Sequence, residues 1–172
     1  MPYKMRTEGM EELTETLRAL GESAESVASM ALFEGAGTMA DTIKKSAEDI
    51  HTEPFKYARP GERRLPSPEE KEIILSVEGK GIAKFRHDGD GVSTSIGYSN
   101  AGYAELGDKT VPIPLIVNAV NSGTSFRIPQ PFMRKAVSSG RKKAEKVMTE
   151  KVESEWEKMM KETEKFKGRK NR

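Results

Sequence analysis

The spacing of apolar residues predicts helices in the first third of the chain. A run of apolar residues at intervals of three and four predicts a short amphipathic helix over 11–20 that ends at Gly21. The same spacing then resumes and predicts a longer helix over 22–51. Gly35 and Gly37 interrupt this second helix, and a glycine costs about 1 kcal/mol at a helical site. We therefore expect close packing against a neighbour, or a bend, at these two glycines.

The middle of the chain predicts a proline-rich loop followed by strands. Residues 52–68 contain four prolines, which remove too many backbone donors for a helix or a central strand. The alternation and β-branched content of 73–77, 82–86 and 92–98 then predict three strands, with glycine turns between them, in a three-strand antiparallel meander. We expect 87–91, His-Asp-Gly-Asp-Gly, to form the second of these turns.

Two shorter segments complete the central region. Residues 103–106 predict an edge strand, and Pro112 and Pro114 should stop regular pairing after it. The apolar run 115–120 has the length of either a buried strand or a helical turn, and periodicity does not separate the two. We favour a short helix there.

The C-terminal region predicts one long helix. Its apolar residues recur every four positions from Ala144 to Met160, with Trp156 among them. Pro131 suits the first turn, and Gly140 is a candidate kink. From Pro131 to residue 166 such a helix would run about 54 Å, longer than the roughly 30 Å of a small domain. Part of its apolar face should therefore project or pack on another subunit.

These elements predict an α+β fold: a small, mostly antiparallel sheet packed by a long N-terminal helix and a long C-terminal helix. With 172 residues, the chain fits a single domain over 1–166 that includes the proline-rich loop at 52–68. The last six residues, 167–172, hold four cations and no acid, which predicts a flexible basic tail.

Composition excludes several classes of protein. Charged residues make up 33% of the chain and the mean hydropathy is −0.67, so the core is expected to be modest. No apolar run predicts a membrane span or a signal peptide, and we expect synthesis in the cytoplasm. There is no cysteine and there are two histidines, so thiolate chemistry is absent and the imidazoles are too few for a usual zinc site. The net charge of +2 does not predict nucleic-acid binding, although 141–172 carries 12 basic and 7 acidic residues.

No nucleotide-binding, lipase-like or zinc-protease motif occurs, so we expect no enzymatic activity, no cofactor and no metal. Asp88-Gly89-Asp90-Gly91 lacks the spaced acids of a calcium loop and favours a hairpin turn. Arg59, Arg63 and Arg64 in the proline-rich arm are expected to contact a neighbouring subunit, and a contact with DNA backbone is the alternative. Trp156 is expected in the core or at an interface.

One segment resembles a known family. Gly123-Thr124, followed by Pro129, Pro131, Phe132, Met133 and Arg134, is similar to the closing signature of tailed-bacteriophage neck or tail-completion proteins, in which a Gly-Thr turn leads to a Pro-x-x-Pro-Phe-Leu-Arg-like segment that opens the last helix. The resemblance covers about 15 residues in motif and most of the chain in element order. It implies that residues 132–134 are the hinge where the last helix docks on the sheet, with plain core packing as the alternative for Phe132.

The resemblance also implies a function and partners. Proteins of that family are structural virion proteins that form a ring, usually of six subunits, at the head–tail junction or the proximal end of the tail. Expected partners are further copies of the chain, head-completion or connector proteins, tail-tube or tail-terminator proteins, and DNA passing through the ring. The expected location is the virion, after assembly in the host cytoplasm.

Three alternatives stay open at this point. The same resemblance covers a tail-terminator ring of a contractile tail or of a bacteriocin. A DNA-binding module would use the basic C-terminus and the arginine arm. A hydrolase would require Glu105, His87 and Asp90 to converge in one pocket.

Overall fold

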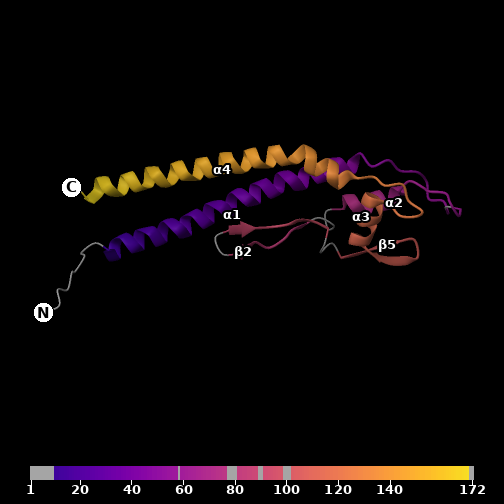
Figure 1. The fold of residues 1–172 in the computed structure, drawn as a ribbon, viewed down its shortest axis with the longest axis horizontal. Coiled ribbons are helices and arrows are strands. Elements are labelled where there is room, and N and C mark those ends of the chain that lie inside the picture. The colour runs from indigo at the N-terminus through magenta and orange to yellow at the C-terminus, as the bar shows by residue number, and fades with distance from the viewer. Residues whose placement is uncertain (1–9, 58, 77–80, 89–90, 99–101, 171–172) are drawn as a thin grey trace.

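Two long helices dominate the fold. The computed structural model describes residues 10–57, 59–76, 81–88, 91–98 and 102–170. Helices α1 (Met10–Glu48) and α4 (Phe132–Lys170) pack side by side and antiparallel, and the short elements lie beside α1 and at the end where α4 begins (Figure 1). The predicted α+β fold, with two long helices and small antiparallel ladders, is confirmed. In the described part of the chain, neither of these helices nor any other has the length and apolarity that a membrane span requires.

Helix α1 is continuous, so the predicted break at Gly21 is wrong. One glycine costs only about 1 kcal/mol in a helix, and the apolar period continues on both sides of it. Close packing against a neighbour, one of the two alternatives expected for the glycines, is found at Gly35. A Cβ at this position would lie 2.5 Å from Met148 Cγ on α4. Gly140 does the same from the other helix, where a Cβ would lie 2.8 Å from Met39 Sδ. The two glycines therefore let the helix axes approach closely.

The segment predicted as the first strand, 73–77, is instead mostly helical. Helix α2 spans Pro68–Leu75. Ser67 caps it: its side chain accepts a hydrogen bond from the Glu70 backbone N–H at 3.2 Å, and the Glu70 carboxylate accepts one from the Ser67 N–H at 2.9 Å. This reciprocal capping box, with a proline in the first turn, starts a helix that the β-branched residues after it do not prevent. Val77 lies outside the described residues.

The strands form two-stranded antiparallel pairs and not a three-strand meander. Strands β1 (Gly81–Ile82) and β4 (Ile96–Gly97) pair with each other, as do β2 (Arg86–Asp88) and β3 (Gly91–Ser93). A backbone hydrogen bond from the Ala83 N–H to the Ser95 carbonyl joins the two pairs into one interrupted hairpin beside α1 (Figure 1). Residues 89–90 of the predicted turn lie outside the described residues. Among the described residues, the segment predicted as the first strand is helical and does not pair with this hairpin.

The strand at 103–106 and the helix at 115–120 are found as predicted, but the strand pairs with a second strand that the sequence did not predict. Strand β5 (Tyr103–Leu106) pairs with β6 (Lys109–Pro112), and the strand ends at the predicted proline. Helix α3 (Ile113–Ser122) contains the apolar run 115–120, as favoured. It forms a helix because its apolar residues lie mainly on one buried face.

The core lies where all four helices converge. Its buried residues come from the end of α1, from α2 and α3, from the start of α4 and from Tyr98. They are Ile43, Ala47, Ile50, Ile74, Tyr98, Ile113, Ile116, Val117, Val120, Phe132 and Ala136. The far part of the hairpin contributes none of them. Helix α4 continues through Lys170 and so includes part of the predicted flexible tail at 167–172, while residues 171–172 lie outside the described residues.

Candidate functional site

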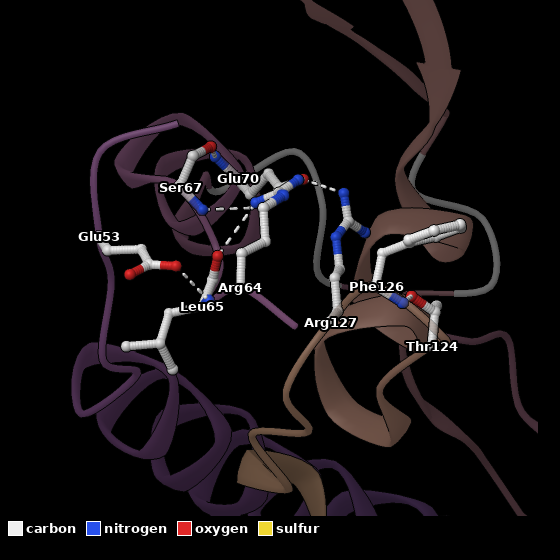
Figure 2. A network of polar contacts seen from close by, with 8 residues as sticks. All are labelled: Glu53, Arg64, Leu65, Ser67, Glu70, Thr124, Phe126 and Arg127. Carbon is white, nitrogen blue, oxygen red and sulfur yellow. Dashed lines mark hydrogen bonds and ion pairs between the residues drawn. The ribbon is translucent and has the colours of Figure 1, made fainter. Parts of the chain in front are cut away.

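A tight turn at 123–127 sets the geometry of the signature segment. Gly123 has φ +74°, and a Cβ on it would lie 3.0 Å from the Arg127 carbonyl oxygen, so both conformation and space require glycine. Thr124 and Arg127 exchange backbone hydrogen bonds at 3.2 and 3.3 Å. The Thr124 hydroxyl oxygen also accepts a hydrogen bond from the Phe126 N–H at 3.2 Å. The turn leaves Phe126 exposed, while the Arg127 side chain reaches Glu70 (Figure 2).

Glu70 is a fully buried carboxylate shared by two arginines (Figure 2). Arg64 donates to both of its oxygens, at 3.1 and 3.2 Å, and Arg127 Nη2 donates to Oε1. With the Ser67 N–H, the carboxylate accepts four hydrogen bonds. Desolvation lowers the pKa of Arg127, and the neighbouring Glu70 carboxylate opposes that change. Two guanidinium groups on one carboxylate leave the cluster with one excess positive charge.

This cluster holds the proline-rich arm, residues 52–67, against the signature turn. The Arg64 N–H donates to the Phe126 carbonyl and the Ile128 N–H to the Arg64 carbonyl, both at 2.9 Å. Farther back, the Glu53 carboxylate accepts a hydrogen bond from the Leu65 N–H at 2.8 Å, and this bond lowers the pKa of Glu53. The arm is therefore an ordered part of the domain in these regions.

The three predicted contact arginines lie in different environments. Arg64 is only 7% exposed and stacks under the Phe55 ring, 4.9 Å from its centroid. The Arg64 guanidinium therefore binds groups of its own chain, Glu70 and the Phe55 ring. Arg59 and Arg63 are exposed, and they remain the arm's candidates for contact with a neighbour.

The rest of the predicted signature starts α4 and packs into the core. Phe132 is 2% exposed and meets Tyr98 edge to face, with ring centroids 6.4 Å apart. The Met133 N–H donates to Asn121 Oδ1 at 3.1 Å, while Arg134 is exposed. Pro129 packs on Gly123, and the Pro131 carbonyl accepts a hydrogen bond in the first turn of α4. Phe132 therefore packs in the core, which was the alternative expected for it.

The apolar stripe of α4 divides into a covered and an open half. A four-residue step on a helix with 3.6 residues per turn advances about 40°, so such a stripe winds around the helix. Ala136, Gly140 and Ala144 are buried against α1. Farther along, Val152, Trp156 and Met160 have rotated away from α1 and are 42%, 52% and 50% exposed. We call these three residues the open face of α4.

An ion pair near the open face joins α4 to α1. Lys151 Nζ lies 2.9 Å from Glu34 Oε1 on α1 and 3.4 Å from Glu155 Oε1 on its own helix. The hydrogen bond to Glu34 is the larger cause of a raised pKa at Lys151. This bridge lies on the side of α4 that meets α1.

Sequence reasoning missed Glu70 and Arg127, the two residues at the centre of the network. A signal for Glu70 was present: Ser67-Pro68-Glu69-Glu70 has the serine and the glutamate of a capping box with proline at the first helical position. No local signal marks Arg127, because its partner lies 57 residues away in the sequence.

The structure describes the side chain of only one of the three residues named for a hydrolase. Glu105 is exposed on β5. Asp90 and the side chain of His87 lie outside what is described. Within the described ranges, no group of three His, Asp or Glu residues is arranged to hold a metal ion.

The fold and this surface define a small α+β protein with a projecting helical hairpin and an open apolar face. No family model matches the chain, and no curated protein or solved structure matches it either.

Proposed function

We propose that this chain is a structural virion protein of a tailed phage or phage-derived particle. In this proposal it forms a homo-oligomeric ring at the head–tail junction or the proximal end of the tail, with head-completion or connector proteins and tail-tube or terminator proteins as neighbours. Two things support it: the resemblance of the segment Gly123–Arg134 to the signature of neck and tail-completion proteins, and the open face of α4. The same support applies to the alternative that the chain forms the tail-terminator ring of a contractile tail or of a bacteriocin.

The open face is the observation that carries the proposal. Val152, Trp156 and Met160 lie on one side of a helix that runs well beyond the core (Figure 1). Tryptophan is among the residues that contribute most to protein interfaces, and burial of an exposed apolar cluster is the main driving force of association. A subunit of a larger assembly has a use for such a face, whereas a monomeric enzyme does not need it.

Electron microscopy of lysates from a strain lacking this gene tests the proposal. We expect separate heads and tails, or tails of irregular length, and the two outcomes distinguish a joining from a terminating role. Normal particles in normal numbers would contradict it. Complementation with Trp156→Asp should fail, while Ser154→Asp should restore particles. Two residues along a helix place a side chain on nearly the opposite side, so the control introduces the same charge on the same helix, away from the open face.

DNA binding along α4 is the second candidate. The 39 residues of this helix include 13 basic and 7 acidic side chains. Several of the acids are paired with lysines or arginines four residues away, such as Glu145 with Arg141 at 2.7 Å. Retention on a DNA column that weakens steeply with salt would support this candidate, and absent or salt-independent retention would remove it.

A further inference from the structure

The cluster around Glu70 carries more positive than negative charge. Arg64 and Arg127 both bind the Glu70 carboxylate, and their side chains are only 9% and 17% exposed, while that of Glu70 is fully buried. Glu53, an acid of the arm, pairs with Lys56 at 3.3 Å instead. The cluster therefore holds two guanidinium groups and one carboxylate. A charge that is largely removed from water without a counter-charge is unfavourable.

Most of the hydrogen-bonding capacity of Arg127 is not used within the chain. A guanidinium has N–H donors on Nε and on both Nη atoms. Among the described residues only Nη2 has a partner, Glu70 Oε1, and the other terminal nitrogen points away from that carboxylate (Figure 2). Every fully buried side-chain nitrogen or oxygen in the described ranges has a hydrogen-bond partner. Nε and Nη1 of Arg127, which have none, therefore reach the surface of the molecule.

Arg64 differs from Arg127 in this respect. Its Nη1 donates to the Leu65 carbonyl at 3.0 Å and to Glu70 Oε2 at 3.2 Å, and its Nη2 donates to Glu70 Oε1 at 3.1 Å. Both terminal nitrogens of Arg64 are thus bound, and the donors that remain for another group are mainly those of Arg127. Desolvation lowers the pKa of Arg127, Glu70 raises it and Arg64 lowers it again, which agrees with a cation that one carboxylate does not fully compensate.

These donors select the chemistry of a ligand. A cation would be repelled by the excess positive charge of the cluster. An apolar group would remove water from the free N–H donors without replacing their hydrogen bonds, which is costly. Carboxylate and phosphate oxygens form short, charge-assisted hydrogen bonds with guanidinium groups and supply the negative charge that the cluster lacks.

We propose that Arg127 binds an oxyanion, a carboxylate or a phosphate group, which accepts hydrogen bonds from its free donors and balances the charge of the Arg64–Glu70–Arg127 cluster. Because the cluster joins the arm to the signature turn, a ligand that binds only the folded chain stabilises this junction. The inference goes beyond the proposed function and does not depend on it. A free anion and an acidic group on a neighbouring molecule supply the same oxygens.

NMR titration of the purified full-length chain tests the site directly. Sodium phosphate and sodium acetate would be added in separate experiments, with sodium chloride holding the ionic strength constant, and the Nε–H signal of Arg127 would be followed. We expect a saturable shift with a midpoint of about 1 mM, a weak association, and a melting temperature that rises over the same range. Tighter binding of phosphate identifies a phosphate ligand, and equal or tighter binding of acetate identifies a carboxylate such as an acidic side chain supplies.

Variants show whether the effect belongs to Arg127. Arg127→Lys keeps a positive charge beside Glu70 but loses the donors that point away from it, so the midpoint of the rise in melting temperature should increase at least about tenfold. Arg63→Gln is the matched control, because it removes an exposed arginine from the arm, and it should leave the midpoint unchanged. The titration of the unaltered chain decides the proposal even if Arg127→Lys does not fold.

Three results would overturn the inference. A signal that does not move with either anion excludes the site. A midpoint above about 100 mM, or one that is the same in Arg127→Lys and the unaltered chain, indicates an adventitious ion only. None of these results bears on the proposed function, because the particle phenotype of the strain lacking the gene is scored separately by electron microscopy.

Discussion

Glu70 and Arg127 form an ion pair across 57 residues of sequence, joining the first turn of α2 to the turn that precedes α4. Arg64 binds the same carboxylate, so three segments meet at one buried acid. Burial of charge costs free energy, and pairing and hydrogen bonds must offset that cost. The arrangement holds the arm and the signature turn in one relative position.

We expect Glu70→Gln to destabilise the chain by about 3–5 kcal/mol, because it removes the buried carboxylate that Arg64 and Arg127 share. Urea unfolding followed by circular dichroism measures the change. Glu69→Gln is the control: it removes the same charge one residue earlier, at an exposed position, and should change stability by no more than about 0.5 kcal/mol. Equal effects of the two variants would show that the buried network contributes nothing specific.

Gly123→Ala should cost about 1–3 kcal/mol, because alanine is strained at φ +74° and its Cβ would crowd the Arg127 carbonyl and Pro129. Gly37→Ala is the opposite case: nothing lies within 4 Å of its Cβ position, and the residue is in the middle of α1. There alanine should stabilise by about 1 kcal/mol. Thermal unfolding of both variants checks the signs, and a stabilising Gly123→Ala would refute the role given to the turn.

Gly140→Ala tests the close approach of the two long helices. The new Cβ would lie 2.8 Å from Met39 Sδ and 3.0 Å from Thr42 Cγ2, so α1 must shift or these side chains must change rotamer. We expect a cost of about 1–3 kcal/mol despite the better helix propensity of alanine. Gly21→Ala, with open space around its Cβ, should be neutral or stabilising in the same denaturation experiment.

Tyr98 should make stability depend on pH in alkaline solution. Burial raises the pKa of its phenol to about 12 from an ordinary 10.0, and its hydroxyl donates to the Ile74 carbonyl at 3.1 Å. Between these two values the unfolded chain loses a proton that the folded chain keeps, so stability is complete below pH 10 and falls as the pH rises toward 12. Tyr98→Phe should lower stability at neutral pH by about 1 kcal/mol and remove this part of the alkaline decrease. An unchanged slope in that variant would assign the decrease to other groups.

Trp156→Ala should change the stability of the isolated chain by less than about 1 kcal/mol, because half of the side chain is already exposed. In the assembled particle the same change should lower the melting temperature clearly, since an interface anchor is lost. A cost of about 3–5 kcal/mol in the isolated chain would instead indicate burial within the subunit.

The extent of sequence prediction differed between the helices and the strands. The long C-terminal helix followed from periodicity, because an apolar face repeats with the helical period. At 115–120 periodicity left strand and helix open, and the favoured short helix is confirmed. The segment 73–77 was misassigned because β-branched residues outweighed the capping signal at Ser67, which is a local hydrogen-bond pattern and not a property of composition. Because this segment is helical, the predicted three-strand meander lacks its first strand.

The sequence by itself determined the α+β class, the long C-terminal helix and an apolar stripe on that helix longer than one domain can cover, whereas it divided the N-terminal helix at Gly21. Only the tertiary structure decided which half of that stripe is open, because this depends on how α4 packs on α1, where Gly35 and Gly140 allow the two helices to approach closely. It also decided that Arg64 is buried while Arg59 and Arg63 are exposed. The reason is physical: helix periodicity is a property of neighbouring residues, whereas the burial of a charge depends on a partner such as Glu70 or Arg127 that folding brings from a distant part of the chain.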